Sequence, residues 1–119
     1  MPNAQRPEDL HLLFVDGVNR KDVDALLALY EPDSMTIGLD GARLGDHASL
    51  RAMLAGFVGA VDRIEGETRK LVVHGDYALM SASFRAVGGE IAGVSGEVAR
   101  RRPDGTWRFL IDDPTFGAA

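Results

Sequence analysis

The sequence predicts a single α+β domain, in which three helices pack on one face of a mostly antiparallel sheet. Apolar residues recur at helical spacing in the first half of the chain, whereas in the second half they alternate as in strands. Short turns that contain glycine separate the alternating segments, so neighbouring strands are expected to pair antiparallel. The length of 119 residues suits one domain spanning 1–119. Its core is expected at about 7–116.

Two helices are expected near the N-terminus. The first begins at Pro7, which needs no amide partner there. Its apolar face consists of Leu10, Leu13, Phe14 and Val18. The second is capped by Asp22 and is expected to extend to Pro32. Its apolar residues follow at i, i+3, i+4 and i+7, namely Val23, Leu26, Leu27 and Tyr30.

A short strand at 34–37 precedes the third helix. The pair Asp40-Gly41 marks a turn after this strand. Asp46 is placed to cap the third helix, whose apolar residues show the most regular helical period in the chain. These residues are Leu50, Met53, Leu54, Phe57, Val58 and Val61.

Four strands are expected in the second half, at 64–74, 77–87, 91–102 and 107–113. The turns between them are predicted at Gly75-Asp76, at Gly88-Gly89 and at Pro103–Gly105. In the last of these, proline presets φ and glycine accepts a positive φ. The result is a meander of adjacent strands.

The two faces of the strand 77–87 differ in character. One face is uniformly apolar and is expected to lie against the helices; it carries Ala78, Met80, Ala82 and Phe84. The other face is mixed, with Leu79 and Ser81 near its centre. Because the helices cover only one side of the sheet, we expect a homodimer through the outer face, with Arg108 as a further candidate contact.

Composition and charge exclude several classes of function. The net charge of −5 argues against a nucleic-acid partner. The chain has no cysteine, and His11, His47 and His74 are scattered at expected surface or capping positions, so no metal site or cofactor is predicted. No apolar stretch is long enough for a membrane span, and residues 1–6 do not resemble a signal peptide. A cytoplasmic location is expected.

Several segments occur in an order that resembles a known family. They are the segment from Phe14 to Asp33, the helix start Gly45–Arg51 and the ending Asp104–Asp112. Together they resemble SnoaL-like domains of the superfamily that includes nuclear transport factor two and ketosteroid isomerase. The resemblance implies a cone-shaped α+β barrel, with the helices in the concave face of a curved sheet and one pocket for a small, apolar-bodied molecule.

The resemblance also implies which side chains line this pocket. The expected ligand-binding residues are Phe14, Tyr30, Met35, Met53, Phe57, Met80, Phe84 and Leu110. The expected acids are Glu97 and Asp112. The tryptophan-to-aspartate spacing of Trp107 and Asp112 resembles many SnoaL-like domains, in which the acid points inward.

The catalytic set of ketosteroid isomerase is not reproduced in this chain. Phe14 stands at the position of its tyrosine, and Gly38 stands at the position of its general base. Only Glu97 has a counterpart in that set. Limonene-epoxide-hydrolase-like enzymes of this fold use an Asp-Arg-Asp set. In this chain the residue two positions after Glu97 is Ala99, which argues against such a set. Steroid isomerisation and epoxide hydrolysis are therefore not expected.

Glu97 and Asp112 are the candidate catalytic residues. Adjacent strands would place them on neighbouring rungs of the sheet, where two carboxyl groups cannot both ionise cheaply in an apolar cavity. One of them would then hold a proton near neutral pH. The alternative is that the acids are structural and pair with backbone amides or with Arg100 or Arg108.

Two functional hypotheses follow. The first is an isomerase, cyclase or dehydratase that works without a cofactor and uses these carboxyl groups. The second is a non-catalytic module for ligand binding or dimerisation. The sequence does not identify the ligand, and it leaves open whether the protein is an enzyme.

Overall fold

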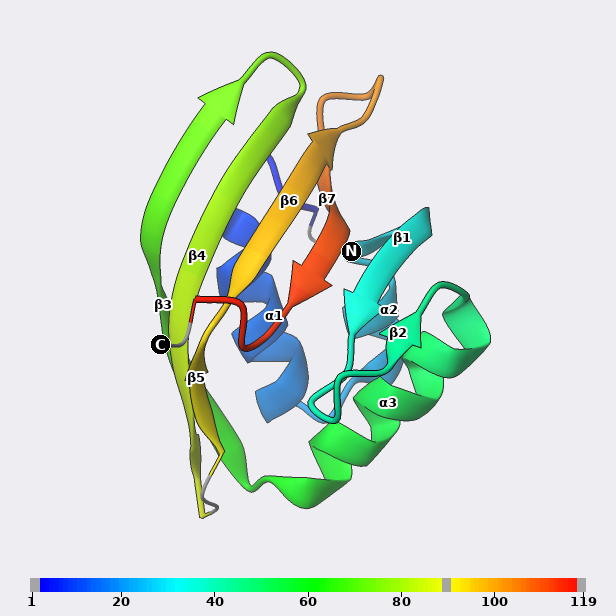
Figure 1. Cartoon of the computed structure of the whole chain (residues 1–119), viewed down its shortest axis with the longest axis vertical. Helices are drawn as coiled ribbons and strands as arrows, with labels where there is room; N and C mark the ends of the chain where they lie inside the picture. The colour runs from blue at the N-terminus through cyan, green and yellow to red at the C-terminus, as the bar shows by residue number, and fades with distance from the viewer. Residues whose placement is uncertain (1–2, 89–90, 118–119) are drawn as a thin grey trace.

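The computed structural model describes residues 3–88 and 91–117, and its helices lie against the concave side of a curved sheet (Figure 1). The helices are α1 (Asp9–Asn19), α2 (Val23–Leu27) and α3 (His47–Ala60). Among the described residues, no helix is long and apolar enough to cross a membrane.

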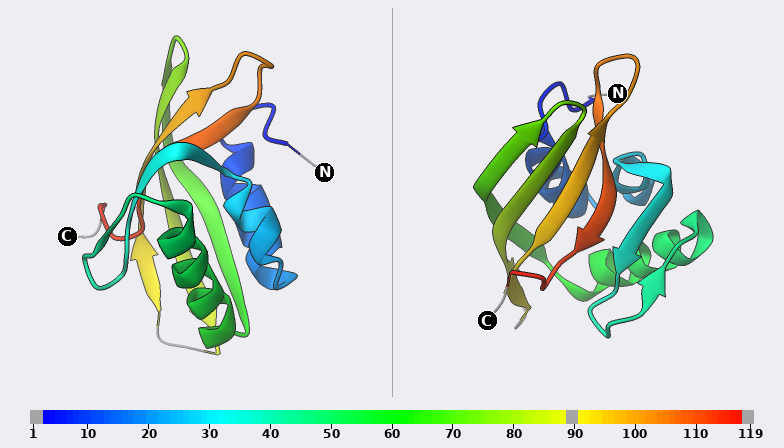
Figure 2. Two further views of the ribbon diagram at one scale, coloured as in Figure 1. Left: turned by 90° about the vertical axis from the view of Figure 1, so that its right-hand side faces the viewer. Right: turned by 45° about the horizontal axis from the view of Figure 1, so that its top comes forward.

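The strands form one twisted sheet, which curves around the helices (Figure 2). They are β1 (Tyr30–Ile37), β2 (Arg43–Leu44), β3 (Arg63–His74), β4 (Tyr77–Val87), β5 (Ala92–Val94), β6 (Gly96–Arg101) and β7 (Trp107–Asp113). The order across the sheet is β2-β1-β7-β6-β4-β3, and β5 pairs with β4 outside this path. All pairs are antiparallel except β1 with β7, which is parallel. The predicted α+β class and the cone-shaped arrangement are confirmed.

Side chains at the helix starts explain where two of the helices begin. The carboxylate of Asp22 accepts a hydrogen bond from the Ala25 amide at 3.0 Å, and that of Asp46 accepts one from the Ser49 amide at 2.8 Å. These bonds satisfy amides that have no partner within the helix. Both predicted caps are therefore observed.

Tyr30 lies in a strand, so the prediction that it ends the second helix is wrong. Helix α2 ends at Leu27, and β1 begins at Tyr30. The Phe109 amide donates to the carbonyl of Leu29 at 2.8 Å, which draws the chain into the sheet beside β7. Pro32 also disfavours helical conformation in the residue before it. The strand predicted at 34–37 is therefore longer at its start.

The strand predicted at 91–102 is divided into β5 and β6 at Ser95. The Ser95 hydroxyl group accepts a hydrogen bond from the Ala82 amide at 3.0 Å, in place of a backbone carbonyl. This substitution interrupts the regular ladder between β4 and its neighbour. The predicted Gly88-Gly89 turn falls partly outside the described residues, because Gly89 is not among them.

Candidate functional site

Three polar side chains form a row across the inner face of the sheet. Thr36 on β1 is paired with Asp112 on β7, and Asp112 is paired with Glu97 on β6. Neighbouring strands lie about 4.8 Å apart, so these side chains stand on adjacent rungs. Each of them contributes to the wall of a cavity between the sheet and the helices. The expected proximity of Glu97 and Asp112 is thus present in the structure.

A β-bulge in β7 decides which of its side chains face this cavity. Val98 is paired with Ile111, but the next residue, Ala99, is paired with Phe109, so Leu110 is an extra residue on β7. The bulge shifts the alternation, and Phe109 and Asp112 both line the cavity although they are three residues apart. The prediction that Leu110 lines the pocket is therefore wrong.

Tyr30 and Asp112 form a partly buried hydrogen bond. The Tyr30 hydroxyl group donates to Oδ2 of Asp112 at 2.7 Å, and Tyr30 is only 1% exposed. Burial, together with the nearby charge of Glu97, raises the pKa of Asp112 to about 7, and the bond from Tyr30 opposes this rise. Burial also raises the pKa of Tyr30 well above its ordinary value, so the phenol remains the donor.

His11 connects helix α1 to two strands. Its Nε2 atom lies 2.7 Å from Oε1 of Glu97 on β6, and its Nδ1 atom lies 2.6 Å from Oγ1 of Thr68 on β3. When Nε2 carries a proton it donates to the Glu97 carboxylate, and Nδ1 then accepts from the Thr68 hydroxyl group in the neutral imidazole. Glu97 therefore has a partner from a helix, and this partner is not one of the arginines that the sequence suggested.

The prediction that His11 lies at the surface or at a helix cap is wrong, because His11 is 7% exposed and lines the cavity. A sequence signal for this placement exists. His11, Phe14, Val15 and Val18 follow at i, i+3, i+4 and i+7, so His11 belongs to the apolar stripe of α1. The predicted apolar face of Leu10, Leu13, Phe14 and Val18 does not include the histidine.

The cavity has a volume of about 100 Å³, and its walls are mostly apolar. Phe14 from α1, Met53 and Phe57 from α3, and Phe84 from β4 are among the predicted residues that line it. Leu39 is 49% exposed and also lines the cavity, which marks the loop after β1 as part of its rim. The other lining residues include Val15, Leu54, Ile64, Gly66, Glu67, Ala82, Ser83, Ser95 and Pro114.

Met80 and Met35 do not line the cavity, in contrast to the prediction. Met80 is 2% exposed and packs in the hydrophobic core, and it is not among the residues that line the cavity. Met35 is paired with Ile111, which is exposed on the outer face of the sheet. Its neighbour Thr36 occupies the inner face instead.

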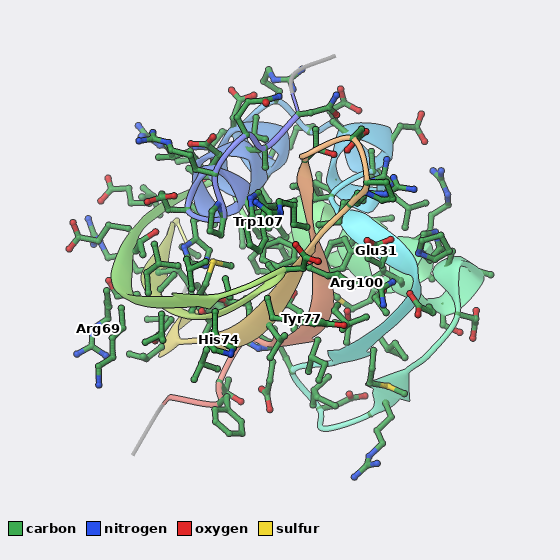
Figure 3. The ribbon with its side chains drawn as sticks, turned by 90° about the horizontal axis from the view of Figure 1, so that it is seen from above. Glu31, Arg69, His74, Tyr77, Arg100 and Trp107 are labelled. Atoms are coloured by element: carbon green, nitrogen blue, oxygen red, sulfur yellow. The ribbon has the colours of Figure 1, made fainter. Side chains whose placement is uncertain are left out.

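The arginines near the end of β6 are bound elsewhere. Arg100 Nη2 lies 2.8 Å from Oδ1 of Asp33, and Arg100 Nε lies 3.5 Å from Oε1 of the buried Glu31. Figure 3 shows Glu31 close to Arg100. Arg101 pairs with Asp76. In the described part of the chain, no group of three or more histidine, cysteine or acidic side chains is placed to hold a metal ion.

A second hollow, of about 230 Å³, lies between α1, α2 and the start of β7. It is larger than the first, but two of its charged groups are paired with each other: Arg20 Nε lies 2.8 Å from Oδ2 of Asp16 on the exposed surface. The first cavity is lined by the buried Glu97, the partly buried Asp112 and the unpartnered hydroxyl group of Thr36, so its chemistry makes it the candidate site despite its smaller volume.

The chain belongs to the SnoaL-like domain family, whose model matches residues 12–113. The three helices and the curved, mostly antiparallel sheet agree with the resemblance to this family. No functionally curated protein matches the sequence.

Solved structures show the same fold at low sequence identity. A candidate calcium/calmodulin-dependent protein kinase type II association domain from Thiobacillus denitrificans has a TM-score of 0.78 at 21% identity, over 96% of this chain and 98% of the other. A candidate dehydratase of the NTF2-like family from Streptomyces avermitilis has a TM-score of 0.71 at 19% sequence identity, over 91% of this chain and 92% of the other. A ketosteroid isomerase-like protein from Erwinia carotovora atroseptica has 0.70 at 15%, over 90% of each chain.

Proposed function

We propose that this protein binds one compact small molecule in the cavity and catalyses a proton transfer on it, as in isomerisation, cyclisation or dehydration. The observation that carries the proposal is the position of Glu97 and Asp112, which are paired across β6 and β7 and face a cavity with mostly apolar walls. Carboxyl groups in this setting exchange a proton with a bound substrate more readily than they do in water.

The two acids have different roles in this proposal. Asp112 exchanges the proton, because its pKa of about 7 leaves both its acid and its base forms populated at neutral pH. Glu97 is held by His11 at 2.7 Å, and its charge favours the protonated form of Asp112. Tyr30 fixes the orientation of the Asp112 carboxyl group through the bond to Oδ2.

A non-catalytic binding module is the second candidate, and one observation favours it. Glu97 and Asp112 each already have a buried hydrogen-bond partner, in His11 and Tyr30 respectively. Acids with a purely structural role are satisfied in the same way. Ligand binding without turnover is what this second function predicts.

The proposed function is tested by screening small fragments for thermal stabilisation and then following each hit by NMR in D₂O. Proton transfer appears as deuterium incorporation, as a shifted double bond or as loss of water. We expect turnover in the wild type, a loss of at least a hundredfold in Asp112→Asn, and near-normal turnover in Asp24→Asn. Asp24 is the control, because its side chain is 80% exposed and does not line the cavity. Equal turnover in Asp112→Asn and the wild type would contradict the catalytic role.

We also propose that a second copy of the chain covers the outer face of the sheet. An apolar row crosses five strands there, through the pairs that join Val72, Leu79, Val98, Ile111 and Met35. Arg108 and Asp113 lie on opposite sides of this row on β7. A two-fold axis that runs along the row therefore places Arg108 of each copy opposite Asp113 of the other.

A further inference from the structure

The hydroxyl group of Thr36 is buried in the cavity wall without a partner. Thr36 is 0% exposed and lines the cavity, and among the described residues its Oγ1 atom is the buried side-chain atom that lacks a hydrogen bond. A buried polar group without a partner costs free energy, so native structures contain few of them. An orphaned hydroxyl group at a cavity surface is explained when a bound molecule supplies the missing bond.

Thr36 does not stand alone at this position. It is paired with Asp112, whose carboxyl group also faces the cavity, so two groups able to donate a hydrogen bond lie on adjacent strands. Tyr30 occupies only Oδ2 of Asp112. The second carboxyl oxygen of Asp112 and the Thr36 hydroxyl group can therefore point at one ligand atom.

The surroundings restrict the charge of the ligand. None of the described side chains that line the cavity is a lysine or an arginine, and both ring nitrogens of His11 are bonded to the protein. An anion would meet three acids, Glu67, Glu97 and Asp112, and no free cation. A cation bound at Asp112 would require this acid to ionise, and an ion pair away from water repays its desolvation only with excellent geometry. An uncharged hydrogen-bond acceptor needs neither a free cation in the cavity wall nor an ionised Asp112.

The volume restricts the size of the ligand. The cavity measures about 100 Å³, and an apolar cavity of about 150 Å³ holds one benzene molecule. A short chain, or a single ring that extends towards the exposed rim at Leu39, therefore matches the space better than a multi-ring molecule.

We propose that the ligand is a compact uncharged molecule whose single oxygen is bound by the Thr36 hydroxyl group and the Asp112 carboxyl group. This inference rests on the proposed use of the cavity as the ligand site. In it, Thr36 is a positioning residue that places the oxygen beside the acid. The oxygen is a carbonyl or a hydroxyl group, because both accept two hydrogen bonds.

The test uses four single-ring probes that differ in one group: cyclohexanone, methylenecyclohexane, cyclohexylammonium and cyclohexanecarboxylate. Their binding is measured by NMR at pH 6 on the wild type, Thr36→Val and Thr36→Ser. We expect the wild type to bind cyclohexanone about tenfold more tightly than methylenecyclohexane, as one good hydrogen bond predicts. We expect both charged probes to bind at least as weakly as methylenecyclohexane.

Thr36→Val removes the hydroxyl group without changing the shape of the side chain, and we expect it to be at least as stable as the wild type, because the lost group has no protein partner. It should lose most of the preference for cyclohexanone, whereas Thr36→Ser should keep it. An unchanged preference in Thr36→Val, tighter binding of a charged probe, or no binding of any probe would overturn the inference. Binding is measured separately from turnover. A negative result in this binding test therefore does not decide whether Asp112 transfers a proton, which the turnover assay in D₂O tests.

Discussion

Tyr30 donates a hydrogen bond to Asp112 at 2.7 Å, although the two residues are 82 positions apart in the chain. The parallel pairing of β1 with β7 brings them together, and the bond lies inside the protein. Since this bond stabilises the ionised form of Asp112 while burial disfavours it, the pair sets the pH range in which the acid titrates.

The stability of the protein should fall as the pH rises from about 4 to 7. Asp112 keeps its proton up to about 7 in the folded state, whereas an unfolded aspartate releases it near 3.8. The folded state therefore binds more protons in this window, and the free energy of unfolding decreases with pH, by on the order of 3 to 4 kcal/mol at most.

Asp112→Asn should remove most of this decrease. The variant should be more stable than the wild type at pH 8 and similar to it at pH 4, because the amide oxygen still accepts from Tyr30. Urea denaturation at several pH values measures this. Asp24→Asn is the control, since the Asp24 side chain is 80% exposed, and it should retain the wild-type dependence. A wild-type slope that persists in Asp112→Asn would contradict the buried titration.

Tyr30→Phe should raise the pKa of Asp112 further above 7. The lost hydrogen bond stabilises the ionised carboxyl group, so its removal favours the protonated form. The variant should also lose about 1 kcal/mol of stability. NMR titration of the labelled aspartate carboxyl carbons measures the change. Tyr77→Phe is a matched control, because Tyr77 is the other tyrosine of the chain and is exposed. A lower pKa in Tyr30→Phe is the outcome that contradicts the prediction.

His11→Leu should destabilise the fold by about 3 kcal/mol or more, because it leaves the Glu97 carboxylate buried without its partner. The double variant His11→Leu with Glu97→Leu should recover much of this loss. Chemical denaturation of the double-mutant cycle provides the measurement. His74→Leu, on an exposed histidine, should change stability little. Additive losses in the cycle would mean that the two side chains do not depend on each other.

Leu79→Lys should prevent the proposed dimer without unfolding the domain. Leu79 lies at the centre of the apolar row on the outer face and is 60% exposed, so a lysine there is solvated in the monomer but would be buried in a dimer. Analytical ultracentrifugation at micromolar concentration should show a dimer for the wild type and a monomer for the variant. Leu12→Lys is the control, because Leu12 on α1 is 62% exposed. A monomeric wild type removes the proposal.

The sequence allowed prediction of the elements whose signals are local. The caps at Asp22 and Asp46 and the bounds of β4 and β7 depend on neighbouring residues, and they occur as expected. The strand predicted at 91–102 and the helical assignment of Tyr30 depend on distant contacts. Ser95 bonds to Ala82 and thereby interrupts the strand predicted at 91–102. Pairing with β7 draws Tyr30, which was expected in a helix, into the sheet.

The sequence alone determined that the chain is an α+β domain with acids on its last two strands, because helical and strand periodicities are properties of neighbouring residues. Only the tertiary structure decided which side chains share the cavity. The bulge at Leu110 turns Phe109 and Asp112 to the same side, and no periodic pattern encodes such a shift. The contact of His11 with Glu97 joins residues 86 positions apart, and its strength comes from burial, which only the folded chain creates.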